Sequence, residues 1–246
     1  MPDEAPDTDY IAWARARTAA MLAAGPVARL VGVMVSSVDA RAALEGKSGG
    51  LSSAPDRALL KAWRAAADAV LVGARTLETE KYGSLVPDAD RDRRLAEGRT
   101  GWPRLITISR RADLDLEQVL ATDPDLPLTV YTAAPASEHP AHRGSDVAFV
   151  VLDDVGPAAV TADARRRFGY AVLGCEGGPH LLAAALADGS LTDLSLTLAP
   201  TVVGTGAPLL PDGEVHAPVA LRLLAAEAHA GSVFVHYAVD GSRRDG

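Results

Sequence analysis

Short apolar runs alternate with helical segments along most of the chain, and this alternation constrains its fold more than any other feature. The run at 28–36 is apolar almost throughout, which is typical of a strand buried on both faces. Further strands are expected at 69–73, 104–109, 128–133, 147–152 and 171–175. Helices are expected at 10–24, from Pro55 with Ser53 as cap, at 157–168 and at 179–188. The pattern predicts an α/β fold with a mostly parallel sheet and helices on both faces.

The alternation stops near the C-terminus. Strands are expected at 194–199, 221–229 and 233–239, and no helical segment separates the last two. Gly231-Ser232 between them is typical of a hairpin turn. We therefore expect an antiparallel hairpin at one edge of the parallel sheet.

Composition and charge limit the possible partners. A chain of 246 residues, 48% of them hydrophobic, fits one domain, expected over 28–240 after an N-terminal extension with a helix over 1–27. The net charge of -8 argues against nucleic acid and anionic membranes. The single cysteine, Cys175, excludes an intrachain disulfide and a zinc-type C-x-x-C pair. No apolar run reaches the roughly 18 residues of a membrane helix. We expect a cytoplasmic protein without a metal site.

A glycine-rich junction between a strand and a helix is the first candidate site. The strand ends at Cys175, and Gly177 and Gly178 lead into a helix that begins near Pro179. Such a junction directs free N–H groups and the positive end of a helix dipole toward one point, where phosphate binds. A tight turn without a ligand is the alternative. Glu176 favours a site, because a carboxylate beside an anion is costly unless it holds a substrate or a proton.

The strand at 69–73 also ends in a glycine, which is followed by a cation and a hydroxyl group. Gly73 permits a ligand to approach the backbone closely, and Arg75 and Thr76 can both donate to phosphate oxygens. A loop with a solvated arginine is the alternative. The pattern indicates a second group of phosphate contacts.

Two arginines follow the end of the strand at 104–109. Ligands of open α/β sheets bind at the carboxyl ends of strands, where Ser109 lies. Arg110 and Arg111 could clamp the 2′-phosphate that distinguishes NADPH from NADH. A surface charge pair is the alternative.

The segment after the first buried strand carries a carboxylate, Asp39. It could face a bound substrate and orient a ring nitrogen, or it could cap a turn. A parallel sheet brings all four of these strand ends to one edge. Their convergence favours a site that holds the phosphates of a dinucleotide.

These motifs together resemble the pyrimidine-reductase domain of riboflavin biosynthesis, the RibD C-terminal domain, over about 28–239. The family's S-x-D-G reads here as Ser37-Val38-Asp39-Ala40. Its L-R-x-x-x-D-A-V-L-V-G-x-x-T, E-G-G-P-x-L and D-E-L-x-L-x-x-x-P-x-x-x-G read as Trp63 to Thr76, Glu176 to Leu181 and Asp193 to Gly204. The resemblance implies a dihydrofolate-reductase-like three-layer sandwich, with 28–240 as a single reductase domain and a C-terminal antiparallel hairpin.

The resemblance also implies an enzyme that reduces a small heterocyclic substrate with hydride from NADPH. The implied substrate is a 5-amino-6-ribosylaminopyrimidinedione phosphate, whose C=N tautomer becomes a ribitylamine. Glu176 and Asp39 are the candidate catalytic residues, which orient the substrate or assist proton delivery. The expected substrate contacts are Asp39, Ser48, Arg64, Glu80 and Glu176. The expected cofactor contacts are Ser36, Gly73, Ala74, Arg75, Thr76, Ser109, Arg110, Gly177, Gly178, Pro179, His180 and Leu181. A homodimer, with the apolar C-terminal strands as its interface, is also implied.

Four departures from the family pattern bear on the substrate. Ala40 replaces the usual Gly, Trp63 replaces the usual Leu, and Glu80 stands where many members have Asp. The loop at 46–50 lacks the aromatic residue that many members carry. The run from Gly73 to Glu78 also resembles dihydrofolate reductase, so a dihydrofolate- or pterin-type reductase is an alternative. A non-catalytic nucleotide-binding relative is another, because binding and turnover use the same groups.

Overall fold

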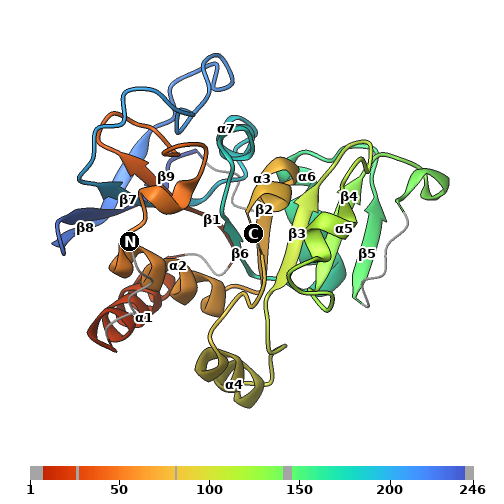
Figure 1. Cartoon of the computed structure of the whole chain (residues 1–246), viewed down its shortest axis with the longest axis horizontal. Coiled ribbons are helices and arrows are strands. Elements are labelled where there is room, and N and C mark those ends of the chain that lie inside the picture. The colour runs from red at the N-terminus through yellow and green to blue at the C-terminus, as the bar shows by residue number, and fades with distance from the viewer. Residues whose placement is uncertain (1–7, 26–27, 81, 141–145, 242–246) are drawn as a thin grey trace.

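The described part of the chain forms one mostly parallel sheet of nine strands (Figure 1). The computed structural model describes residues 8–25, 28–80, 82–140 and 146–241. Its strands are β1 (Arg29–Ser37), β2 (Ala69–Gly73), β3 (Arg104–Ile108), β4 (Leu128–Thr132), β5 (Val147–Val151), β6 (Val172–Cys175), β7 (Asp193–Ala199), β8 (Leu221–His229) and β9 (Ser232–Val239). The order in the sheet is β5-β4-β3-β2-β6-β1-β7-β9-β8. Strands β1 to β7 run parallel, and β9 and β8 form an antiparallel hairpin at one edge.

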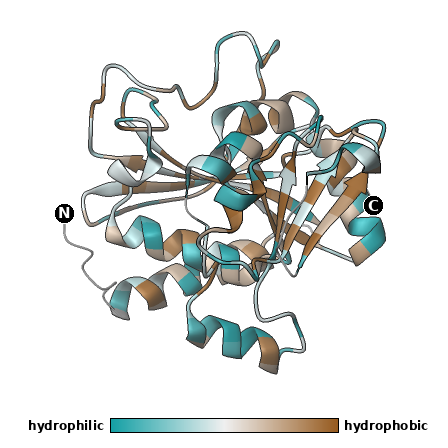
Figure 2. Cartoon of the chain, turned by 45° about the vertical axis from the view of Figure 1, so that its right-hand side comes forward, coloured by the Kyte–Doolittle hydropathy of each residue, from teal (hydrophilic) through white to brown (hydrophobic). Residues whose placement is uncertain are grey.

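Helices cover both faces of the sheet, which gives the molecule three layers (Figure 1). The helices are α1 (Thr8–Ala23), α2 (Ala54–Ala66), α3 (Ala74–Thr79), α4 (Asp88–Ala96), α5 (Leu116–Leu120), α6 (Pro157–Phe168) and α7 (Pro179–Ala187), with short turns η1 (Ser48–Gly50) and η2 (Ala136–Glu138). On β2, Leu71 faces a core shared with α6 and α7, whereas Val70 and Val72 pack with Leu77 of α3. Figure 2 shows hydrophobic residues concentrated on the strands between the layers. The expected dihydrofolate-reductase-like three-layer α/β fold is confirmed.

Capping explains where α2, the helix that carries much of the site, begins and ends. Ser53 is the N-cap, and its hydroxyl accepts a hydrogen bond from the N–H of Asp56 at 3.4 Å. At the other end the guanidinium of Arg94 donates to the carbonyl oxygen of Ala67 at 2.7 Å. A cation at the carboxyl end of a helix also interacts favourably with the helix dipole. The expected cap at Ser53 is confirmed.

Three local features differ from the sequence prediction. The hairpin turn lies at Ala230-Gly231 and not at Gly231-Ser232, because φ is 48° at Ala230 and 82° at Gly231, as a type I′ turn requires. Helices α3 and α5 were absent from the prediction. They have six and five residues, which is too short for an apolar helical pattern to stand out.

Helix α1 packs against the parallel part of the fold and the hairpin at once. Met21 joins Trp63 of α2 and Phe234 of β9 in one buried cluster. The division into an extension over 1–27 and a domain over 28–240 stays a prediction.

Candidate active site

A cleft of about 400 Å³ lies at the carboxyl edge of the central strands. Its walls come from five parts of the chain that are distant in sequence. They are β1 with Val33, the loop after β1 with Ser48, α2 with Arg64, α3 with Thr76, and the start of α7 with Pro179. The parallel topology explains this convergence, because strands that run in one direction bring their carboxyl ends to the same edge.

An ion pair between α2 and the end of β6 forms one wall of the cleft. The guanidinium of Arg64 donates from Nε to Oε1 of Glu176 at 2.6 Å and from Nη2 to Oε2 at 2.7 Å. Tyr82 donates its hydroxyl to the same Oε2 at 3.3 Å, and Arg64 lies 5.3 Å from the centre of the Tyr82 ring. A bidentate pair of this kind fixes both side chains in the plane of the contact.

Electrostatic interactions fix the protonation states of Arg64 and Tyr82 in this wall. Burial alone would lower the pKa of Arg64, but the charge and hydrogen bonds of Glu176 outweigh burial and raise that pKa above its ordinary value. Burial and the neighbouring Glu176 charge both raise the pKa of Tyr82 well above its ordinary range. Arg64 therefore stays a cation and Tyr82 a neutral donor at any physiological pH.

Another wall is a backbone surface built from glycines. The N–H of Gly73 donates to the carbonyl oxygen of Gly177 at 2.7 Å, which joins the ends of β2 and β6. A Cβ atom on Gly178 would lie 2.9 Å from Oγ1 of Thr76, and one on Gly73 would lie 3.4 Å from the N of Gly178. Only glycine therefore leaves the surface beside Thr76 open.

Helix α7 begins at this glycine surface. Gly178 is its N-cap and provides no side-chain acceptor, and Pro179 follows directly. The N–H groups of a first helical turn lack acceptors within the helix, so they point toward the cleft together with the positive end of the dipole. The arrangement fits a diphosphate group.

The structure brings eight of the predicted residues together on the walls of the cleft. They are Ser48, Arg64, Arg75, Thr76, Glu80, Glu176, Gly178 and Pro179. Two of them meet directly, because Ser48 donates its hydroxyl to Oε1 of Glu80 at 3.3 Å. Gly73 and Gly177 lie immediately behind the glycine wall through their mutual hydrogen bond.

Asp39 is not among the residues that line the cleft. Its carboxylate accepts hydrogen bonds from the hydroxyl of Ser37 at 2.7 Å and from the N–H groups of Val203 and Gly204 at 3.0 and 2.7 Å. The Ser37 hydrogen bond and those two N–H groups lower the pKa of Asp39 below its ordinary value. The geometry is that of a carboxylate that caps a turn and ties the β1 loop to the loop after β7.

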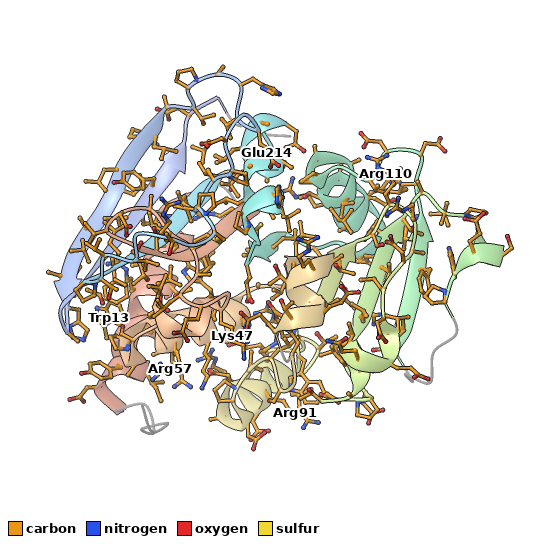
Figure 3. All side chains as sticks on the ribbon, turned by 45° about the horizontal axis from the view of Figure 1, so that its top comes forward. Trp13, Lys47, Arg57, Arg91, Arg110 and Glu214 are labelled. Carbon is orange, nitrogen blue, oxygen red and sulfur yellow. The ribbon has the colours of Figure 1, made fainter. Side chains whose placement is uncertain are left out.

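The remaining predicted cofactor contacts are not among the residues that line the cleft. Ser109, the residue after β3, donates its hydroxyl to Oδ1 of Asp113 at 2.7 Å. Arg110 lies beside the outer strands, away from Lys47 (Figure 3). His180 is exposed and contacts Glu214. Ser36 and Leu181 are buried, and Ala74 opens α3.

Among the described residues, four that the sequence reasoning missed contribute polar groups to the cleft, namely Ser52, Asp56, Thr79 and Tyr82. Tyr82 follows α3 and contacts both members of the Arg64–Glu176 pair, and Asp56 lies in the first turn of α2. A signal for Asp56 does exist in the sequence. It stands eight residues before Arg64, which places both side chains on one face of a helix.

No described group of three or more His, Cys, Asp or Glu side chains is placed to hold a metal ion. Among the described helices, none combines the length and the apolar character needed to cross a bilayer.

Several solved structures resemble this chain in fold. A pyrimidine reductase-like protein from Corynebacterium diphtheriae is 27% identical, with a TM-score of 0.72 over 90% of this chain and 96% of the other. RibD from Acinetobacter baumannii is 18% identical, with a TM-score of 0.69 over 87% of this chain and 58% of the other. The riboflavin biosynthesis reductase Rib7 of Saccharomyces cerevisiae is 16% identical, with a TM-score of 0.63 over 87% of this chain and 90% of the other.

The sequence itself gives the decisive comparison. No curated protein matches it as a whole. The RibD C-terminal domain family matches residues 29–235, which covers the sheet from the start of β1 into β9. By this match the chain belongs to the RibD C-terminal domain family.

Proposed function

We propose that the protein is a cytoplasmic, homodimeric reductase that uses NADPH to reduce a 5-amino-6-ribosylaminopyrimidinedione phosphate in riboflavin biosynthesis. The family membership and the relatives named as pyrimidine or riboflavin-pathway reductases support an oxidoreductase of this pathway. One observation carries the proposal. The charged Arg64–Glu176 pair and the uncapped, glycine-lined start of α7 line the same cleft.

The glycine wall is the proposed site of the cofactor. Gly178 and the first turn of α7 would hold the diphosphate, and Arg75 and Thr76 would donate to its oxygens. NADPH supplies the hydride when it is bound. Arg110, at the end of β3, is proposed to contact the 2′-phosphate, with Ser109 beside it.

The charged wall is the proposed site of the substrate. Arg64 and Glu176 hold each other in one orientation, so the ring meets preorganised donors and acceptors. Ser48 and Glu80 are proposed to contact the ribose side of the substrate from across the cleft. Asp39 acts through the two loops that it joins and is therefore a positioning residue in this proposal.

The edge strand β8 is the proposed dimer interface. Leu221, Leu223 and Leu224 are each more than two-fifths exposed, and an uncovered apolar edge strand invites pairing with another chain. A lysine at Leu223 should shift a dimer toward monomer in analytical ultracentrifugation. A wild-type protein that sediments as a monomer would contradict this part of the proposal.

Gly178→Asp tests the proposed cofactor site. The new carboxylate would collide with Thr76 and repel phosphate, so the KM for NADPH should rise about 100-fold, as expected for a lost charge-assisted anion contact. The measurement is the loss of NADPH absorbance with the ribosylaminopyrimidine phosphate as substrate. Ala187→Asp is the matched control, because it adds the same charge at the far end of α7.

Three outcomes contradict the proposed function. An unchanged KM for NADPH in Gly178→Asp would show that the cofactor binds elsewhere. Faster turnover of dihydrofolate than of the pyrimidine would favour the pterin-type alternative. NADPH binding without turnover of any heterocycle would favour a non-catalytic relative.

A further inference from the structure

Helix α2 presents one stripe of side chains to the cleft. Asp56, Leu60 and Arg64 all line it, and their spacing of four residues places them on one face of the helix. The stripe is about 12 Å long, from eight residues at 1.5 Å each. Arg64, at one end, belongs to the ion pair with Glu176, and the role of Asp56, at the other end, is open.

The carboxyl group of Asp56 is buried among hydroxyl groups. The residue is only 8% exposed, and the hydroxyls of Ser52 and Thr197 hydrogen-bond to its side chain. Within the described chain none of the ion pairs includes Asp56, and Arg57 acts on it only as a nearby charge. A buried carboxyl without a cation partner is rare, because water solvates the charged form far better.

Helix capping alone does not account for this side chain. An acid at the third position of a helix usually reaches back to the N–H of the cap residue, as in a capping box. Here the Ser53 cap is made by its own hydroxyl and the N–H of Asp56. The described hydrogen bonds of the Asp56 carboxyl run instead to Ser52 and Thr197, and the group lines the cleft.

We propose that Asp56, in its protonated form, is the proton donor of the reduction. This inference rests on the proposed function. The carbon of the substrate C=N bond gains the hydride, and NADPH becomes NADP⁺. The nitrogen of that bond gains the proton of Asp56, which leaves an amine and an Asp56 carboxylate. The carboxylate regains a proton from water in the open cleft.

Three described acids line the cleft, and they differ in their ability to carry this proton. Glu80 accepts the hydroxyl hydrogen of Ser48. Both oxygens of Glu176 already accept hydrogen bonds from Arg64, which commits that carboxylate to binding and orientation. Burial raises the pKa of Asp56, and the hydrogen bonds of Ser52 and Thr197 offset only part of the effect. A buried acid with a raised pKa is the usual form of a proton donor near neutral pH.

The surroundings of Asp56 define the expected pH dependence. The charged or titratable groups of the described cleft walls are Arg64, Arg75, Glu80, Tyr82 and Glu176, and Arg57 adjoins Asp56 on α2. The neighbouring strands contribute Val33, Val35 and Thr197, which do not titrate. Turnover should therefore fall as the pH rises through the pKa of Asp56, because only the protonated form donates.

Asp56→Asn tests the proposal with the full chain and NADPH. The amide keeps the shape but has no acidic proton, so kcat should fall about 100-fold, the lower range for loss of a general acid. The decline of kcat at alkaline pH should vanish as well. The Kd for NADPH, measured by quenching of protein fluorescence without substrate, should not change. Asp56→Glu should restore part of the turnover together with the alkaline decline.

Asp90→Asn is the matched control. Asp90 is also a buried aspartate at the third position of a helix, α4. Unlike Asp56, it forms ion pairs with Arg15 of α1 and with Arg93 of α4. Its substitution should change stability and leave both kcat and the pH profile unaltered. A loss of kcat in Asp56→Asn that Asp90→Asn shares would overturn the proposal, because a general effect of helix damage would then explain both.

A titration followed by carbon NMR of aspartate side chains provides a readout without turnover. One carboxyl signal should titrate above the ordinary aspartate range and be missing in Asp56→Asn. A wild-type enzyme whose kcat and alkaline decline survive Asp56→Asn would overturn the role of Asp56 alone. A wild-type protein that reduces no heterocycle would instead overturn the proposed function, and the proton-donor role with it.

Discussion

Two polar regions flank α2, and they use similar residues in opposite ways. One is the cleft, with the Arg64–Glu176 pair and Asp56. The other, which we call the hairpin cluster, consists of Arg29, Thr192, Asp193 and His236, and it lies where β9 pairs with β7. The cleft is open to a ligand, whereas the side chains of the hairpin cluster that pair are at most 4% exposed.

The hairpin cluster satisfies its acid completely. Oδ1 of Asp193 lies 3.0 Å from Nε2 of His236 and 3.6 Å from the guanidinium of Arg29, and Oδ2 lies 2.8 Å from the Thr192 hydroxyl. Burial alone would raise the pKa of Asp193, but these three partners outweigh it and lower the pKa. Asp56 has hydroxyl partners only, and its pKa is raised. A buried acid with a cation supports the fold, and one without a cation remains available for chemistry.

The largest expected effect comes from removing one charge in each region. Asp193→Asn removes the carboxylate charge beside the buried guanidinium of Arg29 and should lower the free energy of unfolding by about 3 kcal/mol. Glu176→Gln, in the open cleft, should lower it by about 1 kcal/mol but reduce turnover strongly. Urea denaturation and NADPH turnover measure the two effects. Equal losses of stability would remove the contrast between the regions.

A second prediction uses the opposite pKa directions of the two aspartates. The pKa of Asp193 is lowered by folding, so its contribution to stability is present above the unfolded-state pKa and disappears as the pH falls through the folded value. The pKa of Asp56 is raised, so its contribution is present below the unfolded-state pKa and disappears as the pH rises through the folded value.

Asp56→Asn should therefore stabilise the protein at neutral pH, on the order of 1 kcal/mol, while it reduces activity. The gain should shrink in mildly acidic buffer. Urea denaturation at a series of pH values measures both. A variant that is less stable than wild type at neutral pH would argue that the Asp56 carboxylate stabilises the fold.

The smallest expected effects concern two alanines in a left-handed conformation, one in the loop that follows β1 toward the cleft wall and one in the turn of the β8–β9 hairpin. Ala40, in the loop after β1, has φ of 59°, and Ala230, in the hairpin turn, has φ of 48°. Glycine relieves the clash of Cβ in this conformation, so Ala40→Gly and Ala230→Gly should each raise stability by about 0.5 kcal/mol. Differential scanning calorimetry measures the change. A loss of stability at either position would contradict the assigned backbone conformation.

The sequence predicts the sheet well, because buried parallel strands leave apolar runs that end in recognisable turns. All nine observed strands lie within a residue of the predicted runs or coincide with them. The glycine wall was predictable for a related reason. Gly73 and Gly178 both stand where a strand ends, and a Cβ atom at Gly178 would lie only 2.9 Å from Oγ1 of Thr76.

The parts of the site that escaped prediction depend on three-dimensional placement. Asp39 lies in the loop after β1, and Asp56 lies at the start of α2. The spacing of Asp56 and Arg64 places them on one helix face, but it does not show that this face lines the cleft. The answer depends on β7 and the loop after it, which supply Thr197 to Asp56 and two N–H groups to Asp39. Tyr82 was missed because its contact with Glu176 joins residues 94 positions apart.

The packing of α1 has a practical consequence for shortened versions of the chain. The family match begins at residue 29, yet Arg29 caps the end of α1 by donating to the carbonyl oxygen of Met21 at 2.9 Å. A chain that begins at residue 29 would lack α1 and would therefore expose the apolar surface around Trp63 that α1 covers. The buried guanidinium of Arg29 would also lose its acceptor on Met21. The segment that the family matches and the segment that must be kept for solubility therefore begin at different residues.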